Sequence, residues 1–144
     1  MAKKDEYVVD SSVVTKWFLI EMDADQAIRL RDEFATGRLR LAVPTLLLYE
    51  VANALRFSGV FNETDLVLAA KSLSKFRFEI WRPVGKLLEL STQLSVREDI
   101  TVYDACYVAL AKRLKTRLVT EDKELLDKFS TDTVRIDRLD DVRT

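Results

Sequence analysis

Four acidic residues in this sequence occupy positions from which a carboxylate could bind a metal ion. Asp10 and Asp122 each follow a short apolar run with the composition of a strand, while Glu50 and Asp104 lie in stretches with the apolar spacing of helices. A carboxylate among apolar neighbours is costly to bury unless it is paired, hydrogen-bonded or metal-bound. A divalent cation would relieve the repulsion between such acids, polarise a phosphoryl oxygen and supply hydroxide from bound water.

The composition excludes several other catalytic chemistries. The sequence contains no histidine, which excludes a Ser-His-Asp triad and histidine-ligated zinc, and its single cysteine excludes a cysteine-rich zinc cluster. Carboxylate oxygen is a hard ligand, so the expected cofactor is a hard divalent cation such as Mg²⁺, Mn²⁺ or Ca²⁺. The net charge of −1 argues against generic polyanion binding, and any contact with nucleic acid therefore requires a local basic surface.

Strand-like and helix-like segments alternate along the 144 residues. Strands are expected over Tyr7–Val9, Leu39–Val43, Phe78–Trp81, Arg117–Thr120 and Thr133–Ile136. Helices are expected over Val13–Ile20, from Asp23 to Gly37, over Leu46–Phe57, Glu63–Lys75, Val84–Arg97 and Thr101–Lys115, and through Leu125 to Phe129. This alternation indicates one three-layer α/β domain spanning 1–144, with a core of about 6–137 and a mainly parallel sheet flanked by helices.

The expected sheet would bring two of the acids to one edge. In an open parallel sheet, ligands bind at the carboxyl ends of the strands, near a change in strand order. Asp10 follows the first expected strand, and Thr120 and Asp122 follow the fourth, so all three should emerge on the same rim. Glu50 and Asp104 would reach that rim from helices.

Each acid also has a structural interpretation. Asp10 and Asp122 could cap the helices that follow them, although Ser11 and Ser12 are also suitable caps for the first. Asp104 lies three residues after Thr101, which is the spacing of a capping box. Glu50 could reach solvent or pair with Arg56 on the same helix. Thr45 is the expected cap of the Leu46–Phe57 helix. The functional hypothesis depends on the ordered set.

Four sequence blocks carry a resemblance to a known family. They are Tyr7–Val13 (YVVDSSV), Tyr49–Leu55 (YEVANAL), Tyr103–Ala111 (YDACYVALA) and Leu118–Asp122 (LVTED), and they occur in order across the chain. Together they resemble the PIN domain, and within it the VapC-type ribonuclease toxins of toxin–antitoxin pairs. The resemblance implies an RNA phosphodiesterase that uses Mg²⁺ or Mn²⁺, with Asp10, Glu50, Asp104 and Asp122 as the acidic site, and Thr120 and Ser11 as supporting hydroxyls.

Substrate and partner contacts are predicted less directly. Lys16, Arg56 and Lys112 lie on helices that carry or adjoin the acids and could meet phosphates, or they could be solvated. Asn53 is a candidate second donor beside Glu50. The resemblance also implies a homodimer and a cognate antitoxin, which the apolar helices would accommodate. With no long apolar segment, we expect a cytoplasmic protein without a membrane span.

Two other functions are compatible with part of this pattern. A phospho-receiver domain also places acids at strand ends and binds Mg²⁺, but it would leave Glu50 and Asp104 without a role. A PIN scaffold that binds RNA or protein without cleaving it would retain the fold and lack the activity. Metal-dependent cleavage of RNA separates this second alternative from a nuclease.

Overall fold

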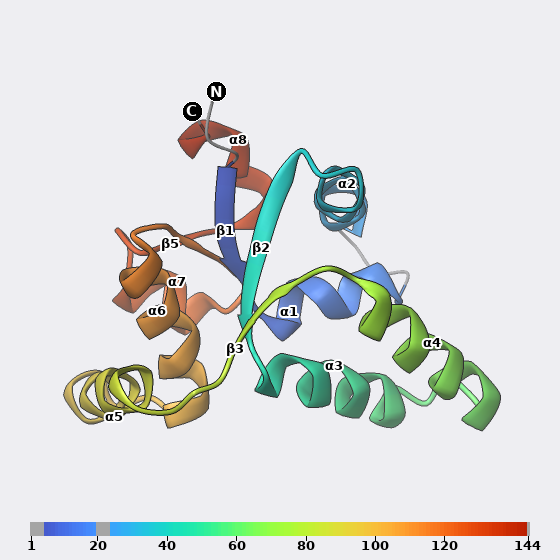
Figure 1. The fold of residues 1–144 in the computed structure, drawn as a ribbon, viewed down its shortest axis with the longest axis horizontal. Coiled ribbons are helices and arrows are strands. Elements are labelled where there is room, and N and C mark those ends of the chain that lie inside the picture. The colour runs from blue at the N-terminus through green and yellow to red at the C-terminus, as the bar shows by residue number, and fades with distance from the viewer. Residues whose placement is uncertain (1–4, 20–23, 144) are drawn as a thin grey trace.

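The computed structural model describes residues 5–19 and 24–143, and the part described forms one α/β domain (Figure 1). Its strands are β1 (Asp5–Val9), β2 (Leu39–Pro44), β3 (Glu79–Trp81), β4 (Leu118–Val119) and β5 (Thr133–Val134). Its α-helices are α1 (Ser11–Val14), α2 (Ala24–Ala35), α3 (Leu46–Phe57), α4 (Glu63–Lys75), α5 (Lys86–Glu98), α6 (Val102–Leu114), α7 (Lys123–Lys128) and α8 (Leu139–Val142). Short 3₁₀ helices are η1 (Thr15–Trp17) and η2 (Ile136–Arg138).

The five strands form one sheet in the order β3-β2-β1-β4-β5, and all of the pairings between them are parallel. The chain first builds outward from β1 through β2 to β3, and then crosses to the other side of β1 for β4. The carboxyl ends of β1 and β4 therefore adjoin where the strand order reverses, which is where open α/β sheets form ligand sites. The predicted parallel α/β domain is confirmed.

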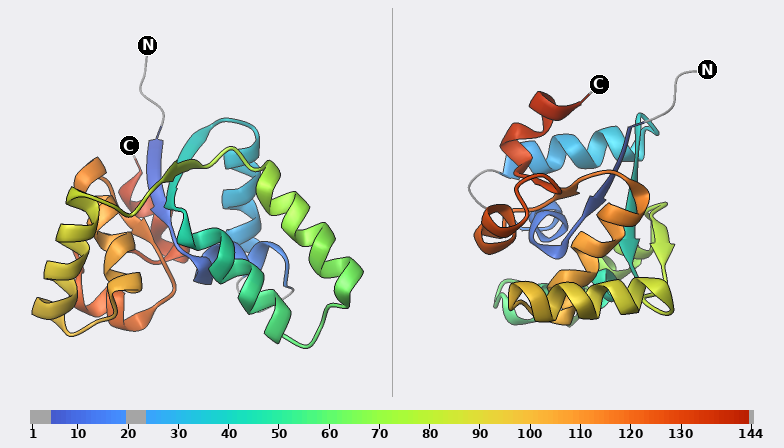
Figure 2. Two further views of the ribbon diagram at one scale, coloured as in Figure 1. Left: turned by 60° about the horizontal axis from the view of Figure 1, so that its bottom comes forward. Right: turned by 90° about the vertical axis from the view of Figure 1, so that its left-hand side faces the viewer.

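Helices cover both faces of the sheet. α6 packs on β1, β2 and β4 and carries α5 on its outer side, while α2 packs on β2 from the other face (Figures 1 and 2). Because α6 is enclosed between the sheet and α5, every residue from Ala105 to Ala111 is buried. The helix pair α3 and α4 extends from the carboxyl edge of the sheet, since α3 begins directly after β2.

An aromatic cluster joins four separate segments beneath the α2 face. The cluster contains Trp17 of η1, Phe34 of α2, Phe76 at the end of α4 and Phe78 just before β3. The centroids of neighbouring rings lie 5.0–6.3 Å apart. Such tilted and offset arrangements add stabilisation beyond the area they bury. The cluster fixes the end of α4 against α2.

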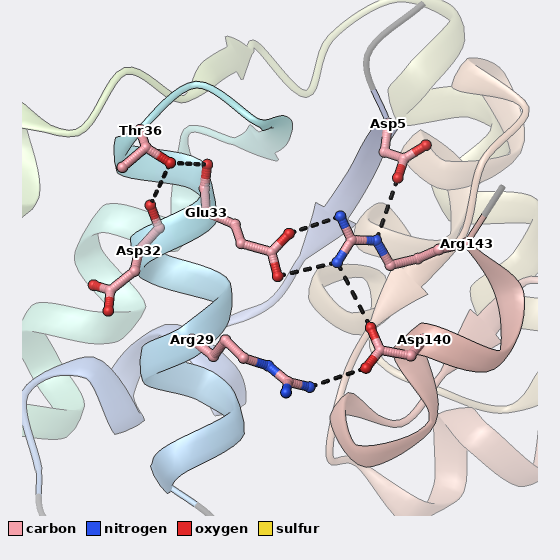
Figure 3. A network of polar contacts seen from close by, with 7 residues as sticks. All are labelled: Asp5, Arg29, Asp32, Glu33, Thr36, Asp140 and Arg143. Atoms are coloured by element: carbon pink, nitrogen blue, oxygen red, sulfur yellow. Dashed lines mark hydrogen bonds and ion pairs between the residues drawn. The ribbon is translucent and has the colours of Figure 1, made fainter.

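Arg143 ties the C-terminal segment to the start of the chain. Its guanidinium contacts Asp5 at 3.3 Å, Glu33 of α2 at 2.7 Å and Asp140 at 3.6 Å, and Arg29 contacts the same Asp140 at 3.0 Å (Figure 3). Asp5 and Glu33 are about one-fifth exposed at their side chains, so these two contacts are better shielded from solvent than ordinary surface pairs.

Several local predictions differ from the structure. The first helix is capped by Asp10, whose side chain accepts from the Ser12 amide, and not by Ser11 or Ser12. In the described part of the chain, Thr45 makes no side-chain cap for α3. The helix expected from Val84 begins at Lys86, after Gly85 at φ +60°, and the strand expected through Ile136 ends at Val134.

The remaining differences concern the ends of the chain. Elements η2 and α8, which follow β5, were not predicted from the sequence. Ile20 and Asp23, which the sequence placed in the first two helices, lie outside the described residues. Within the described ranges no helix has both the length and the apolar character needed to cross a membrane.

Candidate active site

Asp10 is held at the carboxyl end of β1 by hydroxyl groups. One carboxylate oxygen accepts from the Ser12 amide at 3.1 Å and from the Ser12 hydroxyl at 2.5 Å, and the other accepts from the Thr120 hydroxyl. The residue is only 6% exposed. Burial raises the pKa of Asp10 from its ordinary value of 3.8 to about 6, although the hydrogen bonds from Ser12 and Thr120 act in the opposite direction.

The loop after β4 is joined to the loop after β1. Strand register places Val9 opposite Val119, so Asp10 and Thr120 leave their strands side by side. The Thr120 hydroxyl accepts from the Asp122 amide at 3.0 Å, and the Ser12 hydroxyl accepts from the Glu121 amide at 3.0 Å. These bonds orient both strand ends, and Asp122 also caps α7 by accepting from the Leu125 amide at 3.2 Å. The capping interpretation of Asp122 is therefore correct, and it is compatible with a place in the site.

Glu50 is held by a tyrosine from the buried helix α6. The Tyr107 hydroxyl donates to Glu50 Oε1, which joins α3 to α6 across 57 residues of sequence. Burial raises the pKa of Glu50, the hydrogen bond from Tyr107 lowers it, and the charge of Asp104 raises it. The sequence alternatives of a solvent-facing Glu50 or a Glu50–Arg56 pair are not what the structure shows.

Asp104 completes the set from the first turn of α6. Its amide donates to the Thr101 hydroxyl at 3.1 Å, which confirms Thr101 as the cap of that helix. Burial raises the pKa of Asp104, and the charge of Asp122 raises it further. Asp104 therefore lies within electrostatic range of both Glu50 and Asp122.

The arrangement is a chain of coupled groups. Tyr107 has a pKa raised first by burial and then by Glu50, with a smaller effect from Asp10, so both acids lie within electrostatic range of its hydroxyl. The charged neighbours that shift the pKa values of Glu50 and Asp104 are themselves acids. The carboxylates nevertheless do not gather tightly, because no group of three or more potential metal-ligating side chains is close enough to hold one ion among residues 5–19 and 24–143.

The predicted supporting residues separate into two groups. Thr120 is at the site, but the serine hydroxyl bonded to Asp10 is that of Ser12, and no contact of the Ser11 side chain with Asp10 is found among the described residues. Asn53 is exposed on α3, one turn after Glu50.

The predicted RNA-contacting residues are spread out. Lys16 is half-buried in η1. Arg56 lies over the Phe57 ring, with its Cζ 4.8 Å from the centroid, near the end of α3. Lys112 pairs with Asp132 at 2.8 Å and lies eight residues beyond Asp104, about 12 Å along the helix axis. The structure does not bring Arg56 and Lys112 to the acids.

Two site residues were missed by the sequence reasoning, although both had detectable signals. Ser12 lies two residues after Asp10, the spacing at which an aspartate side chain bonds the backbone of a turn. Tyr107 lies three residues after Asp104, on the same helix face, within an apolar stretch. A buried tyrosine requires a partner for its hydroxyl, and a nearby carboxylate is a natural acceptor.

Comparison with known proteins identifies the family of this chain. A sequence model described as "PIN domain" matches residues 7–130. The chain belongs to the PIN domain family. This assignment excludes the phospho-receiver alternative, and it confirms the resemblance inferred from the four sequence blocks.

Relatives of this PIN domain include nucleases and solved structures. Ribonuclease VapC3 of Pyrobaculum aerophilum is 31% identical over 127 residues, covering 85% of this chain and 93% of the relative. The crystal structure of PAE2754 from Pyrobaculum aerophilum is 26% identical with a TM-score of 0.70, covering 94% of this chain and 92% of that one. A toxin–antitoxin complex from Klebsiella pneumoniae, 18% identical with a TM-score of 0.67 and covering 90% and 97% of the two chains, shares the fold.

Proposed function

We propose that this PIN domain is a divalent-metal-dependent ribonuclease and the toxin member of a VapBC-type toxin–antitoxin pair. The observation that carries the proposal is the linkage of the four acids: burial and the charge of Asp104 raise the pKa of Glu50, burial and the charge of Asp122 raise that of Asp104, and the Thr120 hydroxyl bonds both Asp10 and the Asp122 amide where the strand order reverses. The nuclease name of a relative that spans most of the chain supports RNA as the substrate.

The chemistry of the donor set fits a hard cation. Mg²⁺ and Mn²⁺ take carboxylate oxygens and retain several waters, so Asp10 and Asp104 would bind the ion directly and Glu50 and Asp122 would complete the set through coordinated water, since no three described acids are close enough to hold one ion together. When bound, the cation polarises the scissile phosphate and lowers the pKa of a coordinated water.

The chain's own residues prepare the site. Thr120 and Ser12 fix the orientation of Asp10, so its carboxylate cannot rotate away when a cation or substrate approaches. Tyr107 holds one oxygen of Glu50 and leaves the other able to accept a proton from water. Without a cation, burial and neighbouring acids raise the pKa values of Glu50 and Asp104, and a bound divalent cation would offset this repulsion and favour their ionised forms.

The direct test is cleavage of single-stranded RNA by the purified protein. We expect cleavage in Mg²⁺ or Mn²⁺, its loss in EDTA and its loss in Asp104→Asn. Asp127→Asn is the matched control, because Asp127 is an exposed residue of α7 and its substitution makes the same change in charge. Cleavage of a circular RNA distinguishes an endonuclease from an exonuclease. Undiminished activity of Asp104→Asn would contradict the assignment.

A binding-only PIN scaffold is the second candidate function. The observation that favours it is the absence, among the described residues, of three acids close enough to share one ion. RNA binding without cleavage in Mg²⁺, Mn²⁺ or Ca²⁺ would establish this alternative. Cleavage that depends on Asp104 would exclude it.

Partner binding is proposed on the apolar surface beside the site. α3 and α4 enclose a groove of about 240 Å³ lined mainly by Leu55, Leu66, Ala69 and Leu73, and nearby Tyr49 and Phe57 are 82% and 72% exposed. We propose an antitoxin helix as the occupant, a homodimer as the assembly and the cytoplasm as the location. Co-expression with the neighbouring reading frame tests the first, and sedimentation of the purified chain tests the second.

A further inference from the structure

A basic cavity lies at the end of the domain opposite the acids. It has a volume of about 810 Å³ and is bounded by the C-terminal ends of α2 and α4 and the start of β2 (Figure 1). Leu39 at the first position of β2 lines it, whereas the acids lie beyond the last position, Pro44. Five residues of strand span about 17 Å, so the cavity is separate from the candidate active site.

The rim of this cavity carries three cationic side chains. Arg40, Lys75 and Arg77 line it and are exposed, and none of the described residues that line it is acidic. Arg40 lies two residues before Ala42 of β2, and Arg77 lies two residues before Glu79 of β3, which pairs with Ala42. Glu6 lies opposite Arg40 on β1 but does not line the cavity.

The same cations are not used in ion pairs within the described part of the chain. Seven other basic residues of the described chain contact an acid at 2.7–3.7 Å, namely Arg29, Arg31, Lys112, Lys128, Arg135, Arg138 and Arg143. Arg40, Lys75 and Arg77 form no such pair with a described residue. Three cations converging on a concave surface in a chain of net charge −1 create the local basic surface that polyanion binding requires.

The cavity wall adds apolar and aromatic surface to the charge. Phe34 and Phe76 line it, and their rings lie 6.0 Å apart within the aromatic cluster. Half-buried Phe76 presents part of its side chain, and exposed Ser72 adds a hydroxyl. A cationic rim beside aromatic surface is the combination that binds the phosphates and bases of single-stranded nucleic acid.

We propose that this cavity is a second contact site for single-stranded RNA, anchoring a segment of the substrate remote from the cleaved bond. The inference rests on the proposed function for its choice of RNA. At about 3.4 Å per stacked nucleotide, a direct line along β2 corresponds to about five nucleotides, and a path around the surface is longer. An RNA of 20 nucleotides is therefore a suitable probe.

The test measures binding of a fluorescein-labelled 20-nucleotide oligouridine by anisotropy in EDTA, where metal-dependent cleavage does not interfere. The cavity variant combines Arg40→Gln, Lys75→Gln and Arg77→Gln, the three cations that line the basic cavity. Its matched control combines Arg82→Gln, Lys86→Gln and Arg97→Gln, which makes the same charge change at exposed positions elsewhere. Circular dichroism and thermal melting establish that both variants are folded.

The cavity variant should bind RNA more weakly than wild type, and its RNA affinity should depend less on salt. Each phosphate contact on a single strand contributes about 0.7 to the slope of log K against log salt, so losing three lowers the slope by about 2. At 0.1 M salt this corresponds to about a hundredfold loss of affinity. The control variant should keep the wild-type affinity within a fewfold.

Two outcomes overturn the inference, and a third separates it from the proposed function. Equal RNA affinities for wild type, cavity variant and control, or equal weakening of both variants, would exclude a specific anchor. Loss of AMP binding in the cavity variant with unchanged RNA binding would assign the cavity to a compact nucleotide instead. If the cavity variant alone loses RNA affinity but wild type cleaves no RNA in Mg²⁺ or Mn²⁺, the proposed function fails and the RNA contact stands.

Discussion

Replacing Asp10 by asparagine should stabilise the protein in the absence of metal. Asp10 is buried, and its ionised form is held in that environment by hydroxyl and amide donors alone. Asparagine has nearly the same shape, and its oxygen can still accept from Ser12. The Thr120 hydroxyl, which already accepts one amide, would accept a second hydrogen bond from the new side chain.

The size of the effect follows from the pKa of Asp10. Its rise from 3.8 to about 6 corresponds to about 3 kcal/mol, since a change of one in pKa is about 1.36 kcal/mol. Between these values the folded protein keeps a proton that the unfolded chain has released, so stability falls as pH rises through this window and stays lower above it. The Asn variant lacks this penalty, so its advantage should be fully present above pH 6 and absent below pH 3.8.

Thermal melting of both proteins in EDTA from pH 4 to pH 8 measures this difference. For a chain of this size, 3 kcal/mol corresponds to about 6–12 °C at pH 7.5. Adding Mg²⁺ or Mn²⁺ should raise the melting temperature of wild type and leave the variant unchanged, because the bound cation would stabilise ionised Asp10. A variant less stable than wild type at pH 7.5, or a difference that does not change with pH, would refute this account of the buried carboxylate.

Three further predictions concern residues that act through their neighbours. Tyr107→Phe removes the hydroxyl that holds Glu50, so metal affinity measured by calorimetry should fall about 10–100-fold while the fold is kept; unchanged affinity would show that Glu50 needs no support. Thr120→Val removes a donor that lowers the pKa of Asp10, so NMR titration of that carboxyl in EDTA should give a higher pKa than in wild type, and an equal or lower value would contradict the hydrogen-bond assignment. Arg143→Ala leaves Asp5 and Glu33 without their shared guanidinium and should lower the free energy of unfolding in urea by about 2 kcal/mol. Arg138→Ala, which removes a mostly exposed pair, should lower it by under about 0.5 kcal/mol. Similar losses in the two variants would mean that burial of the Arg143 contacts is unimportant.

The sequence predicted the sheet and the rim because these depend on short-range patterns. Each strand is a β-branched or aromatic run, and an acid after a strand of a parallel sheet lies at its carboxyl edge wherever the strand falls in the order. Asp10 and Asp122 could thus be placed before the strand order was known. The apolar helical neighbours of Glu50 and Asp104 indicated that both could be partly enclosed, and both are half-buried in the structure.

What could not be predicted depends on contacts between distant segments. The Tyr107–Glu50 bond joins two helices, and nothing in either helix specifies the other as its partner. Lys112 is a second example: its place on the helix that carries Asp104 suggested a phosphate contact, but it pairs with Asp132, which lies 20 residues further along the chain. Asp10 accepts from Ser12 and not from Ser11 because of how the backbone turns after β1. Two adjacent serines in the sequence do not show which of their hydroxyls will face the carboxylate.

The ion pair between Asp5 and Arg143 places the two ends of the described chain side by side, 3.3 Å apart at their charged atoms. Both ends lie at the amino edge of the sheet, away from the acids, so affinity tags or surface attachment there would leave the catalytic rim open. A short peptide could also join these ends and permit a circularly permuted chain, opened in the exposed connection between α3 and α4 near Gly59. Such a rearranged chain would move new termini beside the apolar groove, giving an attachment point for a sensor of partner binding.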